Sequence, residues 1–194
     1  MADLQRLMQG RVWKFGDSID TGQLAGGGVK VSDDPKENLK ANCMRATRPE
    51  FNEQVQEGDI IVAGTNFGLG SSRSIGVEAV MACGIAAAVV ESASRLYRRN
   101  CVAQGLPLFA VVGITELFDD GDQIEIDYTA GKVRNLTNGG ELDLPKYPSV
   151  VEQIYEAGGI YYTIAKRLDA EGIVPPGGWT LENLKGKQPE APKD

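Results

Sequence analysis

Residues 60–73 read IIVAGTNFGLGSSR, and this stretch decides how the surrounding chain is expected to fold. The first four residues form a continuous apolar run, which predicts a strand that is buried on both faces. A glycine-rich turn follows at 64–70, and we expect a helix from about Ser71 to Cys83. Gly84 ends that helix, since a left-handed backbone conformation costs little in a residue without a Cβ atom. The stretch therefore predicts the first half of a β-α-β unit.

The same pattern continues toward the C-terminus. Residues 85–90 form a second apolar run, Ser92 opens a second predicted helix that ends near Gly105, and residues 106–112 form a third apolar run. Apolar strands joined by helices are typical of a parallel sheet with both faces covered. The sequence thus predicts an α/β protein with a β-α-β-α-β core.

The segments that follow have other periodicities. Residues 122–128 alternate polar and apolar side chains, and residues 132–144 do so more loosely around Asn138-Gly139-Gly140, which predicts a half-exposed antiparallel hairpin. Apolar residues in 149–168 are spaced as in a helix. We expect one long helix there, which Gly158 and Gly159 can break.

Length and composition define the organisation of the chain. The 194 residues are 42% hydrophobic and 24% charged, as in a folded globular protein. We assign 1–172 to one domain and 173–194 to a polar tail that packs poorly or only on a partner. The segment 16–35 is rich in turn-forming residues and is predicted to be a loop.

Charge and hydropathy limit the partners. The formal net charge of −7 argues against nucleic acid or an anionic membrane as a partner. No apolar run approaches the ~20 residues that cross a bilayer, and the first residues lack the apolar core of a secretory signal. We therefore expect a cytoplasmic protein without membrane contact.

The cysteines and the lack of histidine limit the chemistry. Cys43, Cys83 and Cys101 form no Cys-x-x-Cys pair, which predicts reduced thiols packed in the core, with Cys101 facing inward on the second helix. The chain contains no histidine, so histidine-based triads, zinc sites and haem ligation are excluded within it. We predict no metal site in this chain.

The turn 64–73 is the strongest candidate for a binding site. Glycines allow close backbone approach, amide groups at a helix start favour an anion, and the Arg73 guanidinium can bind a carboxylate through two hydrogen bonds. A nucleotide-binding Walker loop would need a lysine, and a dinucleotide fingerprint would need a small residue in place of Arg73. The structural alternative is that Ser71 caps the helix and Arg73 is a surface side chain.

Three ordered motifs resemble a known family. Gly-Ser-Ser-Arg at 70–73 follows Gly-Asp-x-Ile-Asp-Thr at 16–21 and precedes Ser-x-x-Arg-x-x-x-Arg-Asn-Cys-x-x-x-Gly-Leu-Pro at 92–107. Over roughly residues 9–172 the chain is similar to the small subunits of 3-isopropylmalate dehydratase, which correspond to the swivelling C-terminal domain of aconitase. The resemblance implies an α/β fold of the three-layer β/β/α swivelling type.

The resemblance also implies an activity and a partner. The family dehydrates and rehydrates a hydroxy acid, and its [4Fe-4S] cluster lies on a large partner subunit, so no cofactor is expected on this chain. By position, Ser71 matches the serine base, Ser72 a residue that holds the oxyanion, and Arg73 the substrate-carboxylate arginine. Asp20 and Thr21 match a region that binds substrate, although an Asp in such a turn more often caps its own backbone.

The sequence departs from the family pattern in three places. Gly22 replaces a second aspartate, and 74–76 replaces a Glu-His or Glu-Gln pair. The specificity loop carries no arginine, which fits a short or aliphatic extension on a malate-like core; its residues are Gly26, Gly27, Gly28, Val29 and Lys30. The leading substrate is 3-isopropylmalate, and with it leucine biosynthesis.

Several alternatives stay open. Dimethylmalate, citramalate and homocitrate are rival substrates. A protein of another class, a non-catalytic anion-binding assembly module, could retain the turn without the chemistry. A homo-oligomer is also left open for the chain in isolation.

Overall fold

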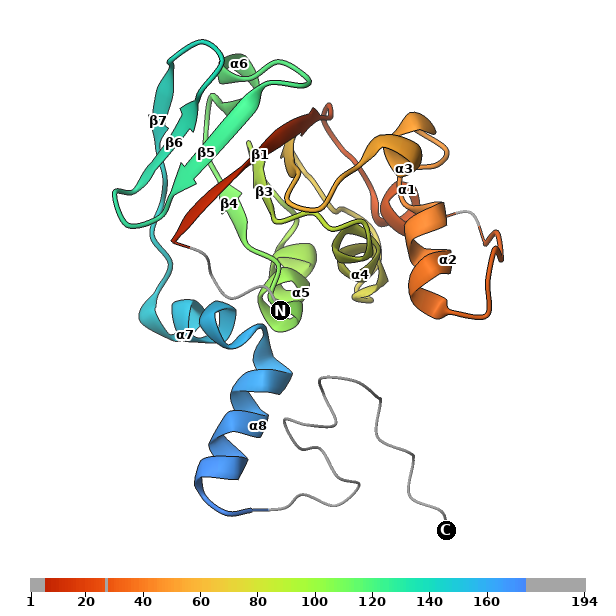
Figure 1. The fold of residues 1–194 in the computed structure, drawn as a ribbon, viewed down its shortest axis with the longest axis vertical. Helices are drawn as coiled ribbons and strands as arrows, with labels where there is room; N and C mark the ends of the chain where they lie inside the picture. The colour runs from red at the N-terminus through yellow and green to blue at the C-terminus, as the bar shows by residue number, and fades with distance from the viewer. Residues whose placement is uncertain (1–5, 27, 174–194) are drawn as a thin grey trace.

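The computed structural model describes residues 6–26 and 28–173, whose strands form one seven-stranded mixed sheet (Figure 1). The central strand β1 pairs in parallel with β2 and antiparallel with β5, so it joins a parallel half to an antiparallel half. The strand order is β4-β3-β2-β1-β5-β6-β7. The strands are β1 (Leu7–Lys14), β2 (Ile60–Ala63), β3 (Ala87–Val90), β4 (Leu108–Ala110), β5 (Gln123–Asp127), β6 (Lys132–Asn135) and β7 (Glu141–Asp143).

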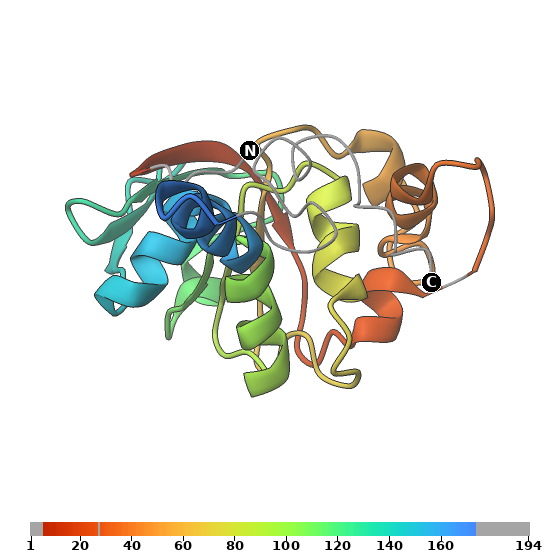
Figure 2. The same cartoon turned by 90° about the horizontal axis from the view of Figure 1, so that it is seen from below.

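Most helices lie beside the parallel half of the sheet, and the last two, α7 and α8, form the C-terminal part of the described chain. Figure 2 shows α4 and α5 next to each other, and the two helices are in contact. The helices are α1 (Thr21–Ala25), α2 (Pro35–Asn42), α3 (Glu50–Gln54), α4 (Ile75–Ala82), α5 (Arg95–Gln104), α6 (Ile114–Leu117), α7 (Ser149–Ala157) and α8 (Ile160–Ala170). Within the described ranges, no helix combines the length and apolarity that a bilayer crossing requires.

Two hydrophobic cores show how the layers stack. Successive strand residues point to opposite faces, so Ile60 and Val62 belong to one core while Ile61 and Ala63 belong to the other. The first core also contains Ile124 of the antiparallel half. It therefore lies between the parallel and the antiparallel halves of the sheet, which are the two β layers. Residues of α1, α3, α4 and α5 close the second core. The predicted three-layer β/β/α architecture is therefore confirmed.

The predicted β-α-β-α-β core is present as β2, α4, β3, α5 and β4. Gly84 and Gly105 follow the two helices with φ of +83° and +86°, as expected for left-handed positions. The start of α5 differs from the prediction: its cap is Ser94, not Ser92, and the Ser94 hydroxyl accepts the Tyr97 amide. Ser92 instead accepts the amide of Asn66 from the preceding turn.

Of the two predictions for the flanking segments, one is wrong in detail. The expected loop 16–35 contains α1, because Asp20 and Gln23 cap each other's amides and start a helical turn. The predicted antiparallel hairpin is present: within 132–144, β6 and β7 pair across a turn at 136–140, and β5 pairs with β6 as a third antiparallel strand. The buried Asn135 fixes this turn, since its Oδ1 accepts the amides of Thr137 and Asn138.

The predicted long helix is divided into α7 and α8 at Gly158 and Gly159, whose φ angles are +88° and +116°. Another glycine makes this break possible: a Cβ atom on Gly105 would lie 2.6 Å from the carbonyl carbon of Gly158. The end of α5 therefore meets the α7–α8 corner backbone to backbone. Of the predicted tail 173–194, residues 174–194 lie outside the described residues.

We expect Gly105→Ala to destabilise the protein much more than Gly139→Ala. Both glycines have positive φ, which costs about 1–2 kcal/mol in an L-residue. At Gly139 a Cβ atom would meet nothing within 4 Å, whereas at Gly105 it would collide with the Gly158 backbone. The free energy of unfolding, measured by urea titration, tests this difference. Equal losses in the two variants would contradict the backbone-to-backbone contact.

Candidate active site

The candidate site lies where the chain leaves β1 and β2, at the carboxyl end of the parallel strands. The segment after β1 pairs with the glycine-rich turn after β2. The Gly68 amide donates to the Ile19 carbonyl at 2.7 Å, and the Thr21 amide donates to the Leu69 carbonyl at 2.8 Å. This pairing brings Asp20 and Thr21 beside the turn, at the end of the sheet where α/β proteins commonly bind ligands.

The turn itself is fixed along its length. At its start, Asp17 Oδ1 accepts the Thr65 amide at 2.6 Å and the Thr65 hydroxyl at 3.0 Å, and these hydrogen bonds lower the pKa of Asp17. In its middle, Gly68 has φ of +73°, and a Cβ atom there would lie 2.1 Å from the Tyr97 ring. Gly70, with φ of +110°, then turns the chain toward Ser71. Only glycine fits these two positions.

Ser71 lies at the centre of the hydrogen bonds that follow the turn. Its amide donates to Thr21 Oγ1 at 2.9 Å. Its own Oγ accepts the Arg73 amide at 3.1 Å, and Arg73 Nε lies 3.5 Å away, at the outer limit of a hydrogen bond. The Ser71 oxygen is thus held among donors, as an oxygen that carries negative charge would need.

The prediction that Ser71 starts the helix is wrong. The helix α4 begins at Ile75, and Ser74 is its N-cap residue. Ser71 therefore does not cap this helix, and the structural alternative for Ser71 is also wrong. The reason is local: the hydrogen bond of the Arg73 amide to the Ser71 hydroxyl closes a separate turn before the helix. The donors around Ser71 therefore come from Arg73, not from the helix start.

Ser72 and Arg73 project from the same turn into solvent. The Ser72 carbonyl accepts the side-chain amide of Asn100 on α5 at 3.0 Å, which fixes the turn from its other side. Sequence reasoning did not single out Asn100. Its signal was present, because Asn100 belongs to the Arg-Asn-Cys part of the third motif.

Asp20 and Thr21 lie beside Ser71 but engage the protein. Asp20 Oδ1 accepts the Gln23 amide at 2.8 Å, so the capping interpretation of this aspartate is the one observed. Thr21 is buried, and its hydroxyl holds the amide of Ser71. The structure therefore brings Thr21, Ser71 and Arg73 together. Asp20 lies at the N-terminal end of α1, where it is the cap residue.

The predicted specificity loop extends from α1 toward α2. Gly26 leaves no space for a Cβ atom, which would lie 1.9 Å from the Gly22 carbonyl oxygen, and Gly28 has φ of +58°. Gly27 lies outside the described residues. Val29 and Lys30 are exposed, and Lys30 pairs with Asp33 at 2.6 Å. The loop thus presents an apolar side chain and an ammonium group that is already paired.

The cysteines do not fit a [4Fe-4S] cluster, which requires thiolates grouped around the iron atoms. Cys43, Cys83 and Cys101 are all buried and free, as predicted for core thiols. A hydrogen bond with Cys83 and burial raise the pKa of the Cys43 thiol, and burial raises the pKa of Cys101. In the part of the chain that the structure describes, no group of three or more Cys, Asp or Glu residues could hold a metal ion.

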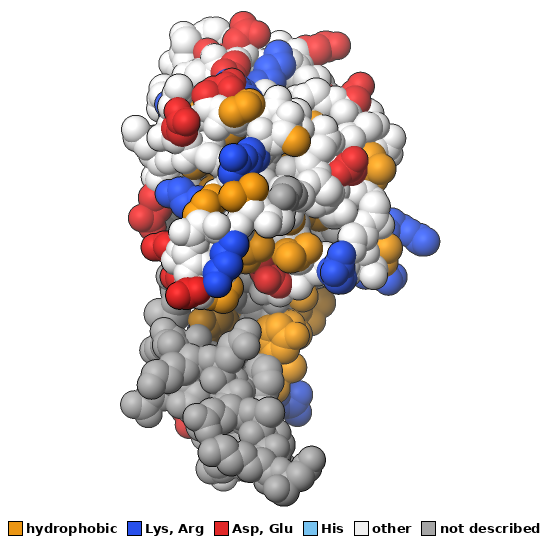
Figure 3. All heavy atoms as spheres, turned by 90° about the vertical axis from the view of Figure 1, so that its right-hand side faces the viewer, with side chains coloured by type: hydrophobic (Ala, Val, Ile, Leu, Met, Phe, Trp, Pro, Cys, Tyr) orange, Lys and Arg blue, Asp and Glu red, His pale blue; other side chains and the backbone are white. Residues whose placement is uncertain are grey.

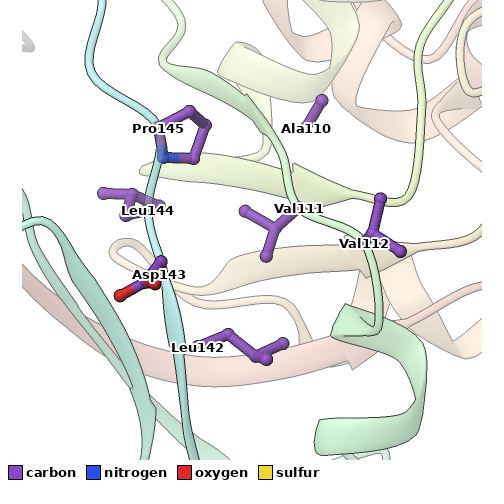
Figure 4. Close-up of a pocket in the computed structure, with 7 residues that line it drawn as sticks. All are labelled: Ala110, Val111, Val112, Leu142, Asp143, Leu144 and Pro145. Carbon is purple, nitrogen blue, oxygen red and sulfur yellow. The ribbon is translucent and has the colours of Figure 1, made fainter.

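Two surface grooves lie away from the candidate site. One, of about 410 Å³, separates the end of β4 from β7 and the residues after it; its lining is Ala110, Val111, Val112, Leu142, Asp143, Leu144 and Pro145 (Figure 4). The other lies between α2 and α3, on residues such as Lys40 and Asn52. None of the predicted site residues lines either of these two grooves; Ser71 is half-buried, and Arg73 is exposed.

Comparisons with known proteins agree with this architecture. Residues 27–110 match the model of the aconitase C-terminal domain. A crystal structure of 3-isopropylmalate dehydratase from Methanocaldococcus jannaschii superposes with a TM-score of 0.79 at 32% identity, covering 86% of this chain and 98% of that one. The fold and these two matches thus define an aconitase-type swivelling domain.

Sequence relatives narrow the class to a family. The 3-isopropylmalate dehydratase small subunit 1 of Methanopyrus kandleri is 43% identical over 84% of this chain and 95% of its own. The isopropylmalate/citramalate isomerase small subunit of M. jannaschii is 37% identical over 85% and 98% of the two chains. The methanogen homoaconitase small subunit of Methanothermobacter thermautotrophicus is 38% identical over 86% and 95%. The chain belongs to the family of 3-isopropylmalate dehydratase small subunits, so the predicted membership in a family of hydro-lyase and isomerase subunits is confirmed.

We expect anaerobic incubation with iron and sulfide to leave the isolated chain colourless. Its thiols are buried and separated into a Cys43–Cys83 pair and a single Cys101, so they cannot surround a cluster. Absorbance after desalting is the measurement, with the denatured chain as a control in which the thiols become reactive. A stable brown [4Fe-4S] protein made from this chain alone would contradict the assignment of the cluster to a partner.

Proposed function

We propose that this chain is the small subunit of a heteromeric hydro-lyase that dehydrates and rehydrates a malate-type hydroxy acid. The observation that carries the proposal is the position of Ser71 Oγ, which accepts the Arg73 amide at 3.1 Å beside the Arg73 guanidinium. A base and a carboxylate-binding cation on one turn are what removal of a proton next to a carboxylate requires.

In this mechanism Ser71 acts as the base. Its oxygen takes the proton from the carbon next to a substrate carboxylate, and the electron pair of that C–H bond forms the double bond as the hydroxyl leaves the neighbouring carbon. A serine hydroxyl normally has far too high a pKa for this role, so its anionic form must be stabilised by nearby donors and positive charge. The Arg73 amide and guanidinium are the groups of this chain that do so.

Other residues at the site bind the substrate or hold the turn in position. Arg73 holds the substrate carboxylate through its planar, two-pronged guanidinium. Ser72 contributes its exposed hydroxyl to the oxyanion that forms. Thr21 and Asn100 are positioning residues, because they hold the Ser71 amide and the Ser72 carbonyl. Asp20 stands at the rim of the site, where it also caps α1.

The open position of the turn supports a partner that completes the site. Ser72 and Arg73 are exposed, and an exposed turn cannot exclude the water that weakens charge stabilisation. We assign that role to a larger subunit, which also holds the [4Fe-4S] cluster as the Lewis acid for the leaving hydroxyl. Relatives are named as small subunits, which supports such a division.

The specificity loop favours an acid with an aliphatic substituent. An acid with a further carboxylate, such as homocitrate, is held best by the two-pronged guanidinium of an arginine, and this loop carries none. Val29 offers an apolar contact instead. We therefore place 3-isopropylmalate first, ahead of dimethylmalate, citramalate and homocitrate. Turnover of the reconstituted complex on these four acids tests the order.

We expect Ser71→Ala to lower turnover by at least ~100-fold, the scale of losing a general base, while the subunit still folds and binds its partner. Ser74→Ala is the matched control, because Ser74 lies on the same segment but its hydroxyl donates to Glu78. Turnover of the reconstituted complex and the melting temperature of each subunit are measured. Near-normal turnover in Ser71→Ala would favour the non-catalytic anion-binding module.

We expect Arg73→Lys to weaken substrate binding strongly even though the charge is kept. A lysine ammonium is a point charge and cannot make the two parallel hydrogen bonds of a guanidinium to a carboxylate. The expected loss is on the order of 2–3 kcal/mol in apparent affinity. Steady-state kinetics of the reconstituted complex measures it, and an unchanged KM would place Arg73 outside the substrate site.

A further inference from the structure

Two asparagines of α2 hold the specificity loop by its backbone. Asn38 and Asn42 lie one helical turn apart and therefore on one face of the helix. Asn42 Oδ1 accepts the Val29 amide at 3.0 Å, and Asn42 Nδ2 donates to the Val29 carbonyl at 2.7 Å. The Asn42 side chain thus engages both backbone groups of one loop residue, as a neighbouring strand would.

Asn38 does the same for the continuation of the loop. Its Oδ1 accepts the amides of Val31 at 2.7 Å and Ser32 at 3.1 Å. Its Nδ2 donates to the carbonyls of Ser32 at 2.8 Å and Asp34 at 3.0 Å. All the hydrogen-bonding groups of this amide are therefore used on the chain that enters α2.

These contacts engage only backbone atoms, so they leave the loop side chains free to face outward. Val31 is 56% exposed and Val29 is 36% exposed, while Lys30 between them pairs with Asp33. Figure 3 looks onto the side of the molecule that carries α2 and this loop, where apolar side chains lie exposed among charged ones. The loop is thus fixed in place while its apolar side chains remain unused by the fold.

We propose that Asn38 and Asn42 determine substrate selectivity by fixing the position at which Val29 and Val31 contact the alkyl substituent of the acid. This inference rests on the proposed function, since it assigns the loop to the same substrate. A loop that is already ordered loses little conformational freedom on binding, and an apolar contact at a fixed position distinguishes substrates by alkyl size. The two asparagines are positioning residues and touch no reacting atom.

A purely structural role for the asparagines makes a different prediction. In that case their loss would lower stability and impair all substrates equally. In the proposed role, their loss impairs an acid with a bulky alkyl group more than one with a methyl group. It also leaves kcat for the smaller acid intact, because Ser71 and Arg73 lie on a different segment.

The experiment compares Asn38→Ala and Asn42→Ala with Asn52→Ala. Asn52 is a matched control because its side chain donates to the Ala41 carbonyl of α2 at 3.1 Å instead of to the loop. Asn42 is buried, so Asn38→Ala, on a half-buried side chain, keeps the test valid if Asn42→Ala folds poorly. Hydrogen exchange of residues 28–32 in the isolated chain reports the loop, and kcat/KM of the reconstituted complex for 3-isopropylmalate and citramalate reports selectivity.

We expect Asn38→Ala and Asn42→Ala to speed exchange in the loop and to lower the 3-isopropylmalate to citramalate ratio of kcat/KM at least roughly fivefold, within the range for small alkyl differences. In Asn52→Ala both readouts should stay at the wild-type value. Faster exchange with an unchanged ratio, or unchanged exchange, overturns this inference alone. A wild-type complex inactive on both acids overturns the proposed function, and this inference with it.

Discussion

The hydrogen bond from the Ser71 amide to the Thr21 hydroxyl, 2.9 Å long, joins two segments that are far apart in the sequence. Thr21 is in position because Asp20 and Gln23 cap the first turn of α1, and Ser71 is in position because Gly70 adopts a φ of +110°. The serine oxygen and the arginine then share one short turn. Every chemical role proposed for this chain depends on that junction.

Close backbone contacts extend the same constraint into the rest of the molecule. Gly68 lets the turn lie against Tyr97 on α5, and Gly105 lets the end of α5 lie against the corner at Gly158. These contacts fix α5, which in turn brings Asn100 to the Ser72 carbonyl. Packing at glycines thus determines the geometry of a site to which those glycines contribute no side chain.

Polar side chains near the site act mostly on the backbone. Thr21 and Asn100 bond to backbone groups of the turn at Ser71, and Asn38 and Asn42 bond to backbone groups of the predicted specificity loop and its continuation. The groups assigned to substrate, such as Arg73, are left exposed. In the proposed function, this arrangement orders Ser71 and Arg73 before a partner covers them, which lowers the entropic cost of assembling the site.

The sequence by itself determined the α/β class, the order of the central strands and helices, the left-handed glycines and the identity of the Ser71–Arg73 turn, because these follow from local periodicity and from motifs of adjacent residues. Only the tertiary structure decided where α4 begins, that Thr21 is buried under Ser71, and that Asn38 and Asn42 hold the specificity loop. The physical reason is that a hydrogen bond between side chain and backbone depends on distances in space. Residues such as Thr21 and Ser71 become neighbours only after the sheet has formed.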